Sequence, residues 1–120
     1  MQEGVKYDEA KPRPSLLPWR EVLAVVDVLE HGARKYSVGN WQRVPDARTR
    51  YFDAAHRHLA AWWLGERNDP DSGLPHLAHA AATLLFLMWF DAEAPDAPGG
   101  GRWDCAAGTG NLLTGLTNKY

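Results

Sequence analysis

The sequence predicts an all-α protein, a small antiparallel bundle of about three main helices. Apolar residues recur with helical spacing in three segments, from Trp19 to a stop near Gly32, from about Ala47 to Gly65 and from Pro75 to about Ala92. Clusters of proline, glycine, asparagine and aspartate separate these segments, and such clusters are typical of turns. Together the periodic segments and the turns favour helix packed on helix.

The first helix follows an arm that is expected to be extended, because residues 1–18 contain three prolines. Pro18 fits the first turn of a helix, where its missing N–H costs nothing. Glycine commonly ends a helix, so Gly32 is the expected C-terminus. Residues 33–45 are predicted to form a loop with at most one turn of helix.

The second helix carries Tyr51, Leu59 and Trp62 on one face. Continuing its helical wheel beyond Gly65 places Glu66 at the centre of that face and Asp69 near its edge. The turn at 68–73 then requires the third helix to pack antiparallel to the second. Because the third helix is apolar nearly all round, it should lie in the core or at a subunit interface.

The chain has 120 residues and a formal net charge of −2, which fits one small domain. We expect residues 1–92 to form this domain, including the arm, and residues 93–120 to form a Gly- and Pro-rich tail. A three-helix unit is small for one hydrophobic core, which favours a homo-oligomer, a dimer or tetramer.

The composition also excludes some classes of protein. A near-neutral chain lacks the clustered positive charge with which proteins bind nucleic-acid polymers or membrane surfaces. The longest near-apolar run, Leu77 to Phe90, is too short to span a membrane, and the N-terminus has no apolar signal segment. A single cysteine, Cys105, excludes internal disulfides. We therefore expect a cytoplasmic protein.

The residues with chemical potential cluster around the turn between the second and third helices. Glu66-x-x-Asp69 precedes the turn, His76-x-x-His79 follows it, and His58 lies one helical turn before Trp62. Carboxylates and imidazoles that project inward from facing helices form the metal sites of helical bundles. Oxygen ligands suit Mg²⁺, and imidazoles shift the preference toward Mn²⁺. Alternatively, Asp69 and Asp71 are only turn and capping residues, and Glu66 leaves the helix and is solvated.

A second group of candidates could bind a nucleotide. Lys35 and Tyr36, followed by Asn40 and Trp41, combine a cation, aromatic rings and an amide, as base recognition requires. The alternative is a loop anchored by Trp41. Further cations that could reach a phosphate are Lys11 and Arg13 of the arm and Arg57 of the second helix, although all three could also be solvated surface charges.

The chain also carries an ordered series of short motifs. In chain order they are D-x-x-K-P-R at Asp8–Arg13, L-L-P at Leu16–Pro18, G-A-x-K-Y at Gly32–Tyr36, N-W at Asn40–Trp41, D-A-A at Asp53–Ala55, R-H-L at Arg57–Leu59, G-E-x-x-D at Gly65–Asp69 and S-G-L-P-H-L-A-H-A at Ser72–Ala80. Together they resemble the bacteriophage dATP/dGTP diphosphohydrolase family, a MazG-like branch of the all-α nucleoside triphosphate pyrophosphohydrolases. The resemblance extends from about Gly4 to Leu87.

The resemblance implies metal-dependent hydrolysis of dATP and dGTP to the monophosphate and pyrophosphate, controlling the nucleotide pool of a phage-infected host cell. Glu66 and Asp69 would be the catalytic residues and the first metal ligands. The superfamily's E-x-x-E half is missing, so the other ligands would come from His58, His76, His79 or Asp53. The rival interpretations are a non-catalytic helical module that binds nucleotide or protein, and a pyrophosphohydrolase of other base specificity.

The same resemblance assigns roles to the nucleotide-binding candidates. Lys35, Arg57 and the arm would neutralise phosphate charge. Trp41 or Tyr36 would stack on the purine, and Asn40 would read its edge. Divalent Mg²⁺ or Mn²⁺ ions would activate the water that attacks the α-phosphorus, and Glu66→Gln is then expected to nearly abolish turnover.

Overall fold

The computed structural model describes residues 2–94, and this part of the chain is helical without strands. Its three helices are α1 (Trp19–Lys35), α2 (Ala47–Trp63) and α3 (His76–Glu93), with short 3₁₀ turns η1 (Pro14–Leu16) and η2 (Asn40–Arg43). The predicted all-α class is confirmed. Cys105 and most of the predicted tail lie outside the described residues.

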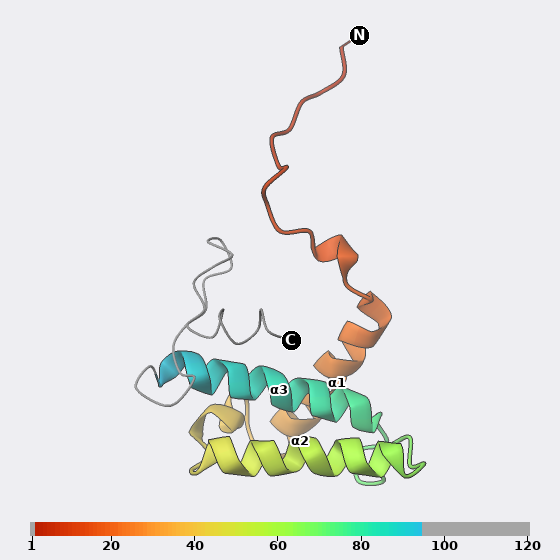
Figure 1. Ribbon diagram of the computed structural model, residues 1–120, viewed down its shortest axis with the longest axis vertical. Helices are drawn as coiled ribbons and strands as arrows, with labels where there is room; N and C mark the ends of the chain where they lie inside the picture. Colours follow the sequence, from red (N-terminus) through yellow and green to blue (C-terminus); the bar gives the residue numbers. More distant parts are fainter. Residues whose placement is uncertain (1, 95–120) are drawn as a thin grey trace, which may run out of the picture.

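Figure 1 shows α2 and α3 side by side and running in opposite directions, with α1 crossing them on one side. The arm before η1 extends away from the three helices, and its residues are exposed along their whole length. The helix α3 contacts both α1 and α2, so it has the central position that its apolar sequence predicts.

The helix α1 begins after Pro18, as expected, but the prediction that it ends at Gly32 is wrong. The helix continues to Lys35, and the Tyr36 N–H donates to the Gly32 carbonyl at 3.0 Å. A glycine commonly ends a helix by adopting positive φ. Gly32 does not have positive φ, so the helix continues through it. The first described glycine with positive φ is Gly39, in the loop after the helix, with φ 75°. The longer helix carries Lys35 on its last turn, beside the loop at 68–73.

The helix α2 ends at Trp63, which invalidates the helical wheel that was continued to Glu66. The Gly65 N–H donates to the Trp62 carbonyl and the Glu66 N–H to the Ala61 carbonyl, the two hydrogen bonds of a Schellman cap. Gly65 has φ 106°, a conformation that L-residues rarely adopt. The chain therefore turns sharply at Gly65, and the position of Glu66 is set by this cap instead of by helical periodicity.

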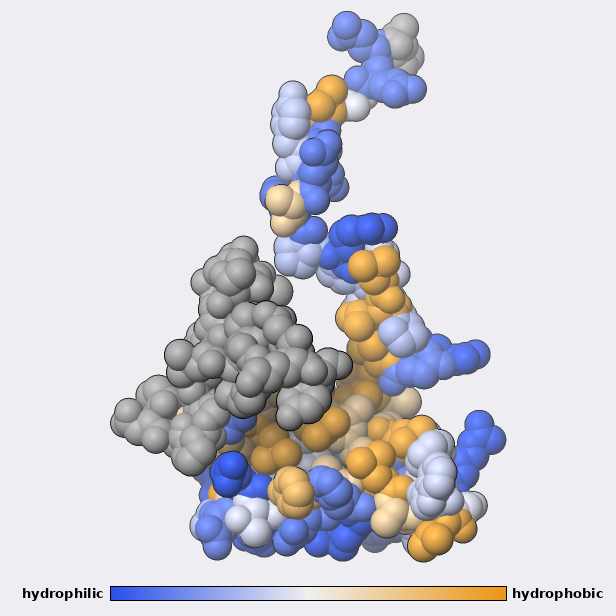
Figure 2. Space-filling view, viewed as in Figure 1, coloured by the Kyte–Doolittle hydropathy of each residue, from blue (hydrophilic) through white to orange (hydrophobic). Residues whose placement is uncertain are grey.

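The core of the described chain is made of small side chains. Val28 on α1 packs against Ala78 and Ala82 on α3, and Ala55 and Ala80 are buried as well. Within residues 2–94, no large side chain is fully buried, while many large apolar ones are exposed. Figure 2 shows hydrophobic residues gathered over α1 and along α3.

Aromatic side chains extend this core at the other end of α3. The Trp41 ring stacks on Phe86 with centroids 4.3 Å apart, and Tyr51 and Phe90 lie within aromatic contact. None of the described helices is long and apolar enough to cross a membrane.

Candidate functional site

The loop that joins α2 to α3 is held by its own hydrogen bonds, and they fix the position of Asp69. Its Oδ1 accepts from the backbone N–H of Asp71 at 2.8 Å and of Ser72 at 3.2 Å. The Asp69 N–H donates to the Leu74 carbonyl at 2.8 Å and the Gly73 N–H donates to the Asp69 carbonyl at 2.7 Å, which closes the loop. Gly73 has φ 74°. Asp69 is therefore a turn residue, as the alternative interpretation states, but its second oxygen, Oδ2, accepts neither of the bonds from Asp71 and Ser72 and lies 3.8 Å from His58 Nδ1.

Three histidines meet beside this oxygen, one from α2 and two from the first turn of α3. His58 Nδ1 lies 2.9 Å from His76 Nδ1 and 3.8 Å from Asp69 Oδ2. The His58 ring also stacks on His79, with centroids 4.6 Å apart. These contacts arise because antiparallel α2 and α3 bring their loop-proximal ends together.

Glu66 completes the cluster from behind His76. Its Oε1 lies 2.6 Å from His76 Nε2, a short charge-assisted contact. His76 is only 4% exposed, whereas the Glu66 side chain is about half exposed at 55%. Because a carboxylate only accepts, Nε2 carries the hydrogen and the Nδ1 lone pair of a neutral His76 faces His58.

The cluster contains a donor set that fits a divalent ion. The ligand atoms of His58, Asp69 and His76 all lie within 4.8 Å of one another. All three side chains are at most partly exposed, so such an ion would be shielded on the protein side. Two imidazole nitrogens and one carboxylate oxygen are a common ligand combination for transition metals.

The environment favours the protonation states that ligation requires. Burial, together with the neighbouring His79, lowers the pKa of His58, and burial also lowers that of His79. Burial acts to raise the pKa of Asp69, but the two backbone N–H donors outweigh it, so the pKa is lowered overall. These directions favour the neutral form of the His58 imidazole and the ionised form of the Asp69 carboxyl, which are the forms that bind a metal ion.

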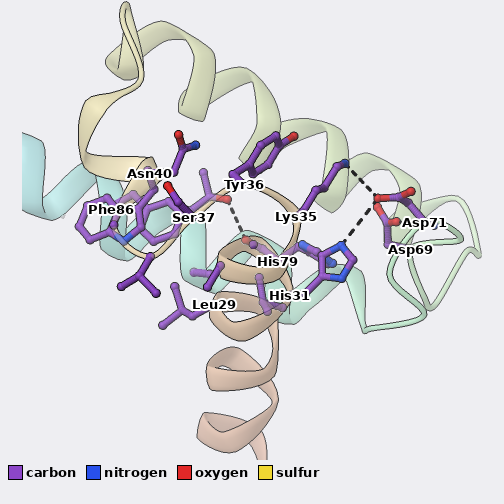
Figure 3. A pocket seen from close by; sticks show the side chains of 18 of the residues that line it. Leu29, His31, Lys35, Tyr36, Ser37, Asn40, Asp69, Asp71, His79 and Phe86 are labelled. Atoms are coloured by element: carbon purple, nitrogen blue, oxygen red, sulfur yellow. Dashed lines mark hydrogen bonds and ion pairs between the residues drawn. The ribbon is translucent and has the colours of Figure 1, made fainter.

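A pocket of about 540 Å³ opens beside the cluster, lined by residues of all three helices and of the loop after α1. Figure 3 shows Asn40, Ser37 and Phe86 at one end of this pocket and Asp69 and Asp71 at the other. Its size is within the range of small-molecule sites. One end is therefore aromatic and amide-bearing, and the other adjoins the histidine–carboxylate cluster.

Basic side chains lie at the acidic end. Lys35 Nζ is 3.2 Å from Asp71 Oδ2, and His31 Nε2 is 3.7 Å from the same oxygen (Figure 3). The hydrogen bond to Asp71 raises the pKa of Lys35. Arg57 also lines the pocket, from α2.

The structure adds three residues to the site that the sequence did not predict there: His31, Asp71 and Ser72. His31 and Asp71 line the pocket, and Ser72 Oγ lies 2.7 Å from His79 Nε2. His31 could have been found from the sequence in one way. It is spaced i,i+4 from the candidate Lys35, which places both side chains on one helical face. Ser72 has no such signal, because only the folded loop brings it to His79.

The structure brings most of the predicted site residues into two adjoining groups. The cluster contains His58, Glu66, Asp69, His76 and His79. The pocket lining contains Lys35, Tyr36, Asn40, Trp41 and Arg57.

Three predicted residues do not join either group. Asp53 is exposed on α2 and lines no part of the pocket, and Lys11 and Arg13 are exposed on the extended arm. Trp41 lines the pocket, but its ring also stacks on Phe86, so it anchors the loop as the alternative interpretation states. Any role of Asp53, Lys11, Arg13 or Trp41 toward a substrate stays a prediction.

The fold and the site define a small all-helical protein in which a histidine–carboxylate cluster adjoins a pocket of about 540 Å³. The family model described as dATP/dGTP diphosphohydrolase, N-terminal, matches residues 1–98. The chain belongs to this family. A curated protein of Salmonella phage PMBT28, named dATP/dGTP diphosphohydrolase, is 35% identical over 103 residues.

This alignment covers 86% of the present chain and 34% of the phage protein, so the chain spans about a third of that relative's length. No solved structure matches the chain significantly.

Proposed function

We propose that the protein hydrolyses purine deoxynucleoside triphosphates, dATP and dGTP, to the monophosphate and pyrophosphate in a metal-dependent reaction. The observation that carries the proposal is the position of the histidine–carboxylate cluster at one end of a pocket whose other end suits a base. Family membership and the name of the phage relative support the same substrates.

The pocket suggests how the nucleotide lies. The base would occupy the end with Tyr36, Asn40 and Trp41, where an amide can bond a purine edge and an exposed ring can stack on it. The triphosphate would extend toward Lys35 and Arg57, whose charges offset those of the phosphates. This orientation brings the phosphates to the end that adjoins His58 and Asp69.

The chain's own residues would position and activate the reacting groups. Asp69, with His58 and His76, would hold a divalent ion such as Mn²⁺ or Mg²⁺, and the fit of the three ligand atoms supports this. When bound, the ion would supply Lewis acidity that stabilises phosphate charge and lowers the pKa of the attacking water. Lys35 and Arg57 would stabilise charge on the departing pyrophosphate.

We also propose that the protein works as a homo-oligomer in the host-cell cytoplasm. The small core and the exposed apolar side chains of α1 and α3 support self-association.

The proposal is tested by incubating the protein with each of the four dNTPs in Mn²⁺, in Mg²⁺ or in EDTA, and separating the products by ion-exchange chromatography. We expect dAMP and dGMP with pyrophosphate, and none in EDTA. Nucleotide binding without product would favour the non-catalytic module, and hydrolysis restricted to pyrimidines would favour the other specificity.

A further inference from the structure

We propose that His58 Nδ1, His76 Nδ1 and Asp69 Oδ2 form a three-ligand site for a transition-metal ion, and that Glu66 is a positioning residue that acts through His76. The inference rests on the proposed function and specifies its metal centre. It also changes the role of Glu66, which sequence spacing presents as the first metal ligand.

The distances between the ligand atoms fit one ion. Neighbouring ligands of an octahedral ion at about 2.1 Å are about 3.0 Å apart, and those of a tetrahedral ion at that distance are about 3.4 Å apart. The two imidazole nitrogens are 2.9 Å apart, and Asp69 Oδ2 is 3.8 Å from His58 Nδ1. All three ligand atoms lie within 4.8 Å of one another, so the Asp69 carboxylate would have to move toward the two nitrogens for all three to bind one ion.

Hydrogen bonding explains why Glu66 supports this site from outside it. Glu66 Oε1 accepts from His76 Nε2, so this nitrogen holds its hydrogen and Nδ1 offers a lone pair. A metal-ligating histidine ordinarily donates its other N–H to a carboxylate or carbonyl in this way. Since Glu66 approaches His76 on the side opposite to His58, the same carboxylate cannot also ligate an ion held between the two Nδ1 atoms.

The position of the three ligands leaves one side of the ion open to substrate. His58 and Asp69 line the pocket, whereas His76 is buried behind them. An ion held at these atoms therefore faces the pocket with coordination positions free for phosphate oxygens. Two nitrogen ligands and one oxygen favour Mn²⁺, Co²⁺ or a later transition metal over Mg²⁺.

The experiment measures Co²⁺ binding to the nucleotide-free full chain, by visible absorption and by calorimetry. We expect one ion per chain, with d–d absorption bands that indicate nitrogen ligation, and no displacement by millimolar Mg²⁺. Two variants remove single ligands without removing the fold. Asp69→Asn keeps the Oδ1 acceptor that caps the loop, and His58→Gln changes a partly exposed residue; each should weaken Co²⁺ binding more than 100-fold.

A third variant tests the positioning role. Glu66→Gln should weaken Co²⁺ binding about 10- to 100-fold while leaving one ion per chain and the same absorption bands. The matched control is His56→Gln, on the same helix as His58, because His56 is exposed and bonds the Phe52 carbonyl instead of the cluster. Far-ultraviolet circular dichroism of every variant should match the parent.

The inference is overturned if the parent chain binds no Co²⁺, or if Asp69→Asn and His58→Gln bind as the parent does. Loss of the nitrogen-ligand bands in Glu66→Gln would make Glu66 a ligand and overturn its positioning role. These readouts are independent of turnover. A chain that binds Co²⁺ as expected but releases no pyrophosphate refutes only the proposed reaction, whereas dATP hydrolysis that survives loss of the triad refutes only this metal site.

Discussion

Lys35 and Arg57 are the lysine and the arginine among the described residues that line the pocket, one from the end of α1 and one from the middle of α2. In the present structure Lys35 is paired with Asp71, an exposed contact that solvent screens. A polyanionic substrate would compete for this lysine. Lys11 and Arg13 of the arm, which the sequence also predicts to bind phosphate, do not line the pocket.

Lys35→Ala and Arg57→Ala are therefore expected to raise the KM for dATP about tenfold each, with a smaller effect on kcat. Steady-state pyrophosphate release measures both constants. Arg48→Ala is the matched control, since Arg48 is an exposed cation of α2 that does not line this pocket. An equal rise in KM for Arg48→Ala would mean that the effect is one of net charge and would refute specific phosphate contacts.

Single residues also show what a sequence can reveal about a site. The i,i+3 pair His76 and His79 could be predicted to share a helical face, and its meeting with His58 follows from antiparallel packing. The contact between Glu66 and His76 could not be predicted by periodicity, because it depends on a glycine with positive φ that redirects the chain. Ser72 and Asp71 are positioned only by the hydrogen bonds of the folded loop.

The ends of the helices decide where these side chains lie. The sequence correctly predicts three helices and the start of α1, but two of its helix ends depend on glycine conformation, which composition does not specify. Gly32 remains helical and Gly65 adopts φ 106°. The same residue type therefore has opposite effects, because only at Gly65 do the following residues form a Schellman cap.

Gly65→Ala is expected to lower the free energy of unfolding by about 1–3 kcal/mol, because alanine at this φ is strained even though open space surrounds it. Gly32→Ala is the matched control: the site is helical and equally open, so alanine should stabilise the protein by about 0.5–1 kcal/mol. Urea denaturation followed by circular dichroism measures both. Equal effects of the two substitutions would contradict the assignment of the cap to Gly65.

At the scale of the whole molecule, one apolar face of α3 is about half exposed within the described chain. Leu77, Leu84, Leu85 and Met88 lie on this face, each between 44% and 52% exposed. The helix has no Asp, Glu, Lys or Arg before Asp91, so the same face of a second copy would meet no charge that it must bury. Self-complementary apolar faces of this kind form two-fold symmetric dimers, and the proposed occupant is therefore a second copy of the chain.

Analytical ultracentrifugation should accordingly find a dimer or larger assembly at micromolar concentration. Leu84→Glu should shift it toward monomer, because each copy would place a carboxylate in the apolar interface. Val5→Glu, a similar change on the exposed arm, should leave the assembly unchanged. A monomeric parent chain, or an assembly that Leu84→Glu leaves intact, would contradict an interface on this face.

The most direct test of the central claim is the metal dependence of pyrophosphate release from dATP and dGTP. The account predicts equimolar deoxynucleoside monophosphate and pyrophosphate in Mn²⁺, none in EDTA, and restoration when Mn²⁺ is added back. Asp69→Asn should reduce the rate at least 100-fold with an unchanged circular dichroism spectrum. Pyrophosphate release that persists in EDTA, or a chain that hydrolyses neither purine nucleotide in any divalent metal, would contradict the account.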